Sequence, residues 1–104
     1  MKSSLDNQAL LSSLQRALLG QIPSKLRQAS AEVGTGQTVC IRFEYDGEPS
    51  DDDREFCSVA ATEVIADFPA PWELDEQHLA NPVPGALNGL SVVAFRRNDK
   101  EHAA

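Results

Sequence analysis

Cysteine and histidine are scarce in this sequence, with two residues of each type among 104. Two cysteines are too few for the disulfide framework of a small secreted protein, so we expect Cys40 and Cys57 to be reduced and packed as small apolar side chains. A disulfide or a reactive thiol is the alternative. No Cys-x-x-Cys or His-x-x-x-His spacing occurs, and His78 and His102 lie far apart. The sequence therefore predicts no metal site and no cofactor.

A long apolar run is also missing. No stretch approaches the roughly 18 consecutive apolar residues that span a membrane. The N-terminal residues 1–6 contain one lysine, but Asn7, Gln8 and Ser12 interrupt any apolar segment behind it, which argues against a secretory signal. We therefore expect a cytoplasmic protein that does not bind a membrane.

Basic residues are almost absent from the middle of the chain. The net charge is −7, from 9 Lys and Arg against 16 Asp and Glu. Residues 44–76 hold twelve acids and a single base, Arg54, whereas residues 1–43 and 77–104 are slightly basic. This central segment should repel nucleic-acid phosphates and attract a basic protein partner.

No candidate motif for catalysis or ligand binding has the sequence context that its chemistry requires. Gly34-Thr35-Gly36 precedes a strand pattern rather than a helix, so it predicts a hairpin turn and not a phosphate-binding loop. The acidic run Asp46–Asp53 lacks the spacing of a calcium-binding loop. Cys40 and His78 have no flanking residues that support a nucleophile and its base. We predict that the chain has no catalytic residues and is not an enzyme; a small enzyme of unrecognised type is the weakest alternative.

Hydrophobic periodicity predicts six elements in the order α-β-β-α-β-β. Ser4 and Gly20 are suitable cap residues for the first helix, and Ser50 for the second. The last strand has apolar residues on both faces, which predicts a central place in the sheet. The predicted elements are a helix over Leu5–Leu19, strands over Gln28–Val33 and Thr38–Tyr45, a helix from Ser50 to Asp67 or Phe68, a strand that starts at Trp72, and a strand over Leu90–Arg97.

These elements predict an α+β fold in a single domain over residues 1–104, with a frayed tail over residues 98–104. Its sheet should have four largely antiparallel strands, with both helices on one face. The first two strands should form an antiparallel hairpin around the Gly34-Thr35-Gly36 turn, because glycine supplies the positive φ that tight turns need.

The run from Val39 to Phe68 resembles a family of small bacterial proteins. The resemblance rests on a strand, the Asp46-Gly47-Glu48 turn, an acidic helix start and the closing Ala-Thr-Glu-Val-Ile-Ala-Asp-Phe of residues 61–68, together with residues 18–27. This family is associated with immunity in contact-dependent growth inhibition and related polymorphic toxin systems. The resemblance implies a small cytosolic protein that binds and neutralises a cognate toxin and has no catalytic activity of its own.

Many such toxins are nucleases with basic substrate grooves, so we predict a stoichiometric nuclease inhibitor whose acidic residues contact the toxin. Charge alone, and not the resemblance, selects these residues. A homodimeric regulatory or structural domain is the alternative function. The predicted partner-binding residues are Glu44, Asp46, Glu48, Asp51, Asp52, Asp53 and Glu55, with Glu63 and Asp67 as weaker candidates.

Overall fold

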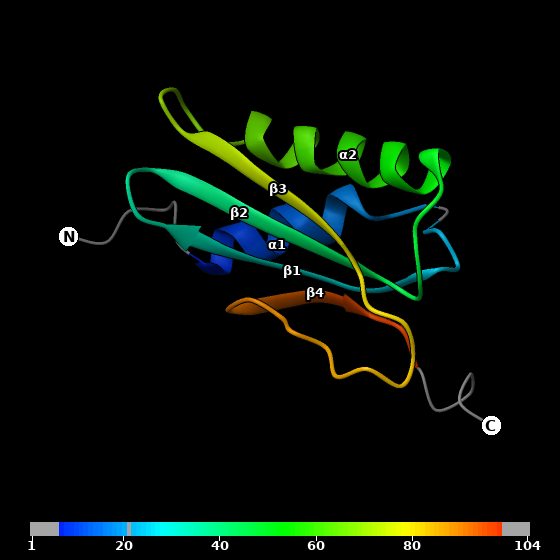
Figure 1. Cartoon of the computed structure of the whole chain (residues 1–104). Helices are drawn as coiled ribbons and strands as arrows, with labels where there is room; N and C mark the ends of the chain where they lie inside the picture. Colours follow the sequence, from blue (N-terminus) through cyan, green and yellow to red (C-terminus); the bar gives the residue numbers. More distant parts are fainter. Residues whose placement is uncertain (1–6, 21, 99–104) are drawn as a thin grey trace.

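The computed structural model describes residues 7–20 and 22–98 and contains six elements in the predicted order (Figure 1). The expected helix start at Leu5, its Ser4 cap and the tail from residue 99 onward lie outside the described residues. The elements are α1 (Asn7–Ala17), β1 (Leu26–Gly34), β2 (Thr38–Tyr45), α2 (Asp51–Ala66), β3 (Glu73–Ala80) and β4 (Val92–Arg96).

The sheet has four strands in the order β3-β2-β1-β4, and both helices pack on one of its faces (Figure 1). β1 pairs antiparallel with β2 and with β4, whereas β2 and β3 run parallel. A parallel pair needs a long crossover connection, and α2 supplies it between β2 and β3. The α+β fold and the β1–β2 hairpin are thus confirmed, and the sheet is mixed.

The prediction that the last strand is central is wrong. β4 lies at the edge of the sheet, and it begins at Val92 rather than at Leu90. Its apolar residues do not imply a covered position on both faces, because Val93 is 38% exposed. An irregularity in the pairing of β1 with β4, between Ala29 and Ser30, interrupts strict alternation along this edge.

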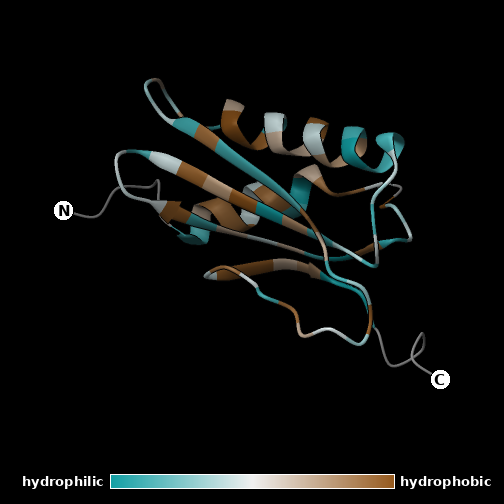
Figure 2. Cartoon of the chain, in the orientation of Figure 1, coloured by the Kyte–Doolittle hydropathy of each residue, from teal (hydrophilic) through white to brown (hydrophobic). Residues whose placement is uncertain are grey.

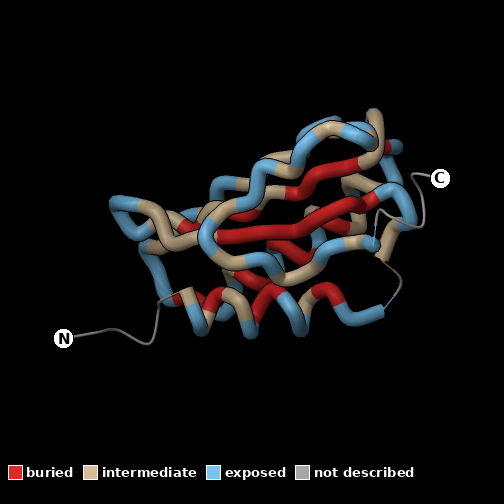
Figure 3. The backbone as a smooth tube through the Cα atoms, turned by 90° about the horizontal axis from the view of Figure 1, so that it is seen from below, coloured by how far each residue is buried: buried red, intermediate tan, exposed pale blue. Residues whose placement is uncertain are grey.

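The core lies between the sheet and the helices. Alternate residues of β2 are fully buried on the helix side, and they belong to one core cluster with Leu10 and Leu14 of α1 and with Leu18, which follows α1. Figure 2 shows the apolar residues of the helices and central strands, and Figure 3 shows that the most buried backbone follows the two central strands. This period-two burial is the pattern that the sequence predicted for residues 38–45. The buried β2 residues are Val39, Ile41, Phe43 and Tyr45.

Candidate protein-binding surface

Four of the seven predicted contact residues are exposed around the start of α2. Figure 2 shows this end of the helix as hydrophilic. Arg54 compensates part of its charge, because its guanidinium pairs with Glu48 and lies 3.6 Å from Asp51. Asp52 and Glu55 have no ion pair in the described part of the chain. We call the four exposed residues the α2 acidic surface: Glu48, Asp51, Asp52 and Glu55.

Asp53 is committed to the helix itself. Ser50 is the N-cap residue, and its hydroxyl accepts a hydrogen bond from the Asp53 N–H at 3.1 Å. The Asp53 carboxylate in turn accepts one from the Ser50 N–H at 3.0 Å, which completes a capping box. The three aspartates in the first turn also interact favourably with the positive end of the helix dipole. The helix therefore starts where the sequence predicted, and the same residues create the local negative charge.

Asp46 lies in the turn between β2 and α2, and its carboxylate is held in place there. Its carboxylate accepts hydrogen bonds from the Val83 N–H at 3.0 Å and from the Arg97 guanidinium at 3.0 Å. These two donors, the backbone N–H foremost, hold the pKa of Asp46 below its usual range. Asp46 therefore joins the β2–α2 turn to the segment after β3 and to the end of β4.

An Asp46→Asn variant should be less stable than the wild type at neutral pH. Because the folded-state pKa is depressed, the stabilisation by the Asp46 carboxylate is present above the ordinary aspartate pKa and is lost as the pH falls through the folded value. The difference in unfolding free energy should therefore shrink below about pH 4. Urea denaturation at a series of pH values measures it; a difference that does not vary with pH would contradict the assignment.

Glu44 does not belong to the exposed set. The structure places its side chain inside the molecule, with none of it accessible to solvent, so its predicted role as a surface contact is corrected here. Its Oε2 accepts a hydrogen bond from Gln28 Nε2 at 3.0 Å. Its Oε1 accepts one from Asn81 Nδ2 at 3.0 Å and one from the Asn88 N–H at 2.8 Å. Glu44 thus fastens the β3–β4 connection to the sheet.

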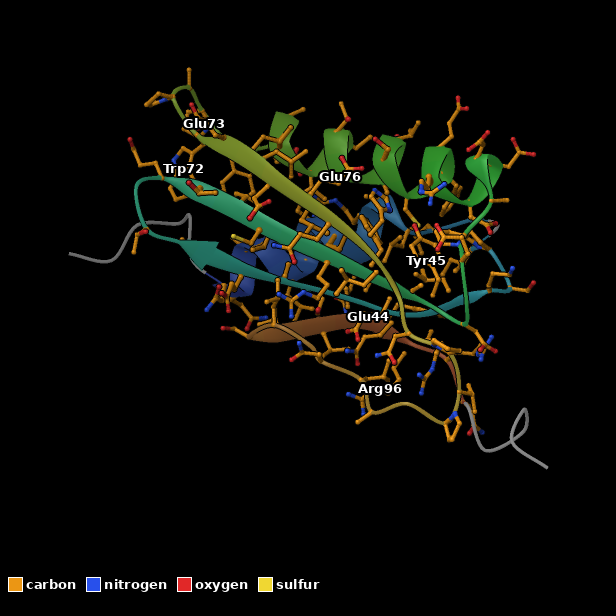
Figure 4. The ribbon with its side chains drawn as sticks, viewed as in Figure 1. Glu44, Tyr45, Trp72, Glu73, Glu76 and Arg96 are labelled. Carbon is orange, nitrogen blue, oxygen red and sulfur yellow. The ribbon has the colours of Figure 1, made fainter. Side chains whose placement is uncertain are left out.

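This connection, residues 81–91, covers part of the sheet face that lies opposite the helices. We call it the strap. The Leu90 N–H donates to Ser30 Oγ at 3.0 Å, and the Arg42 guanidinium donates to the Asn88 carbonyl at 2.6 Å. Figure 4 shows Glu44 and Arg96 on the strap side of the sheet, away from α2. The alternation of polar residues in β1 and β2 indicates a polar face, but no sequence signal identified the segment that covers it.

Of the weaker candidates, Glu63 lies in the second half of α2 and Asp67 is its C-cap residue. Both are exposed, and Asp67 also accepts hydrogen bonds from Ser13 Oγ at 2.6 Å and from the Arg16 guanidinium at 2.9 Å. Asp67 therefore joins α2 to α1. Val59 lies between the two acidic ends of the helix and is 51% exposed. The outer face of α2 thus carries acids at both ends and an apolar side chain between them.

A chain of hydrogen bonds also links β2, β3 and α2. The Tyr45 hydroxyl bonds to His78 Nδ1 at 2.8 Å, His78 Nε2 pairs with Glu76, and Ser58 Oγ donates to Glu76 at 3.3 Å. Burial raises the pKa of Tyr45 above its ordinary value, and burial raises that of Cys57 to about 11. Both groups are therefore protonated at neutral pH. This chain of hydrogen bonds fixes α2 to the sheet. Tyr45 and Glu76 are labelled in Figure 4.

Two further properties of the described residues bear on the kind of site. Within residues 7–20 and 22–98, no group of three or more His, Cys, Asp or Glu side chains is arranged to hold a metal ion. No helix in that part of the chain is both long enough and apolar enough to cross a membrane. Cys40 and Cys57 are both free thiols in this structure; Cys57 is buried as expected, whereas Cys40 is only half-buried.

Comparison with known proteins adds one finding to this geometry. A family model described as MafI2 immunity protein matches residues 7–99. The match starts at the first residue of α1 and extends beyond β4, so it includes both helices and all four strands. No curated protein matches the chain.

Proposed function

The chain belongs to the MafI2 immunity protein family, and from this membership we propose that it neutralises a nuclease toxin by covering a basic groove with the α2 acidic surface. An immunity protein protects by inhibiting a toxin, so the chain is an inhibitor rather than an enzyme. The proposal further includes binding at a ratio of one to one and inhibition of the toxin in the cytoplasm.

One observation carries the choice of surface: four exposed acids lie together at the start of α2 and in the turn before it, and they are only partly neutralised by Arg54. A groove that binds nucleic acid must be basic, because it has to hold phosphates. An acidic helix face can occupy such a groove, and the opposite charges would speed encounter. Val59, in the middle of this face, would add apolar contact where the charges leave a gap.

The homodimeric alternative has less support. A stable dimer needs a continuous apolar interface. The large apolar side chains exposed in the described part of the chain are Leu19, Val59, Leu79 and Val93, and they come from different parts of the fold. They follow α1 and lie in α2, β3 and β4, respectively.

The experiment that tests the proposal is a titration of the purified cognate toxin domain with this chain. The remaining cleavage of RNA and of DNA is measured after each addition. We expect cleavage of one of the two substrates to fall linearly and to end at one molar equivalent of the chain. A toxin that binds the chain but cleaves neither nucleic acid would overturn the nuclease assignment. Cleavage that is unaffected by an excess of the chain would overturn the proposed inhibition.

A further inference from the structure

The sheet face opposite the helices is divided into a covered half and an open half. In the covered half, Ser30 pairs with Arg42 across β1 and β2, and Gln28 pairs with Glu44. The strap lies over these pairs and bonds to them through Asn88 and the Leu90 N–H. In the open half, toward the β1–β2 turn, a hollow of about 610 Å³ is lined by residues of β1, β2 and β3.

One row of side chains crosses the hollow from strand to strand. Glu32 is the register partner of Cys40, and Cys40 is the register partner of Asp75. The thiol therefore lies between two carboxylates that come from different strands. The row is followed toward the turn by Gly34 and Thr38, which are also register partners and also line the hollow.

Among the described residues, neither carboxylate has a basic partner. Glu32 accepts a hydrogen bond from Ser91 Oγ at 2.9 Å. Asp75 accepts hydrogen bonds from Gln77 Nε2 at 3.2 Å and from Cys40 Sγ at 3.7 Å. Neither forms an ion pair with any described residue. By contrast, Asp46 and Asp67, which fasten elements together, are each paired with an arginine.

The lack of a side chain at Gly34 leaves room in the hollow. A Cβ atom at Gly34 would lie 3.4 Å from Cys40 Sγ and 3.7 Å from Thr38 Cβ, so a larger residue would begin to fill the space. The pKa of Cys40 lies above its ordinary value. Burial raises it most, and the negative charges of Asp75 and Glu32 raise it further. Arg42, the base whose charge acts in the opposite sense on the Cys40 thiol, is engaged with Gln77 and the strap.

We propose that this hollow receives a positively charged side chain, arginine or lysine, of the toxin. The hollow lies on the sheet face opposite the helices, so a toxin that also contacts the α2 acidic surface would have to extend around the β3 edge of the sheet. A guanidinium or ammonium group in the hollow would have Glu32 on one side and Asp75 on the other, and it would compensate both charges. The inference rests on the proposed function for the identity of the occupant, whereas the cation preference of the hollow is a property of this chain alone.

Cys40 itself reports the charge of the hollow. Methanethiosulfonate reagents react when the thiolate sulfur attacks the sulfenyl sulfur; a disulfide forms, methanesulfinate leaves, and the thiol proton goes to solvent. We would compare a trimethylammonium reagent with a sulfonate reagent of similar size, at low salt and on the full chain. Cys57 is fully buried and is replaced by alanine in a parallel sample to confirm the site of labelling.

We expect the cationic reagent to react with Cys40 at least about tenfold faster than the anionic reagent, relative to their rates with free cysteine. The ratio cancels the effect of the thiol pKa, which is the same for both reagents. In the Glu32→Gln/Asp75→Asn variant the ratio should approach the free-cysteine value, whereas Glu55→Gln on α2 should leave it unchanged. Equal rates of the two reagents in the wild type, after division by their rates with free cysteine, would overturn the proposal. So would the absence of labelling by either reagent.

Labelling in the presence of the toxin domain identifies the occupant. Saturating toxin should slow the labelling of Cys40 at least about tenfold, through the occupied hollow. A toxin that binds but leaves Cys40 as reactive as before would overturn the hollow as part of the interface and leave the proposed inhibition standing. A toxin that does not bind at all would overturn the proposed function, and the cation preference would then be judged from the free chain.

Discussion

A Glu44→Ala variant should lose about 3 kcal/mol of unfolding free energy, the largest effect we expect from a single change outside the apolar core. The truncation removes a buried acceptor that takes three hydrogen bonds. The amides of Gln28 and Asn81 and the N–H of Asn88 would be left without their acceptor. The strap would keep its bonds to Arg42 and Ser30 and should therefore loosen, rather than detach, before the core itself is affected.

Glu48→Ala is the matched control for this variant. Glu48 is exposed, lies four residues further along the same acidic run, and interacts with Arg54 at the surface. Its loss should change the unfolding free energy by no more than about 0.5 kcal/mol. Urea denaturation compares the two, and hydrogen exchange over residues 81–91 shows whether the strap is loosened. Equal effects of the two substitutions would contradict the structural role of Glu44.

Neutralising the α2 acidic surface should slow association with the toxin by about tenfold to a hundredfold at low salt. The variant is Asp51→Asn/Asp52→Asn/Glu55→Gln. It spares Asp53, whose carboxylate caps the helix, and Glu48, which pairs with Arg54. Because these charges act at a distance, the loss should fall mainly on the association rate and should weaken its dependence on ionic strength. Stopped-flow association at several salt concentrations measures both.

A second triple variant separates the position of the charges from the net charge. Gln8→Lys/Ser12→Lys/Gln15→Lys changes exposed positions on α1 and shifts the net charge by the same amount, three units, as the α2 variant. We expect its association rate to stay within about threefold of the wild type. If both variants slow association equally, overall charge rather than the α2 acidic surface steers the encounter. Thermal unfolding of each variant verifies that its fold is intact.

The elements of this fold could be predicted where local sequence determines them. The alternation in residues 38–45 gives β2, and Ser50 followed by three aspartates gives the start of α2, because capping and helix-dipole effects act within one turn. The strand order could not be predicted in the same way. The parallel pairing of β2 with β3 and the edge position of β4 depend on how the connections pass over the sheet.

The candidate surface was only partly predictable for the same reason. Glu44 and Glu48 look alike in the sequence, as acids in one dense run. Their difference arises from Asn81 and Asn88, which lie 37 and 44 residues after Glu44 and cover it in the folded chain. The hollow around Cys40 likewise depends on three strands meeting in register. Charge density located the region, and tertiary contacts decided which of its acids face solvent.

The most direct test of the central claim is growth of cells that express the cognate toxin domain together with this chain. The account predicts that the wild type restores growth, and that Asp51→Asn/Asp52→Asn/Glu55→Gln restores it less well at the same expression level. The α1 variant of equal charge should protect like the wild type. Failure of the wild type to restore growth would contradict the assignment of this chain to that toxin, and full protection by the α2 variant would contradict the role of its acidic surface.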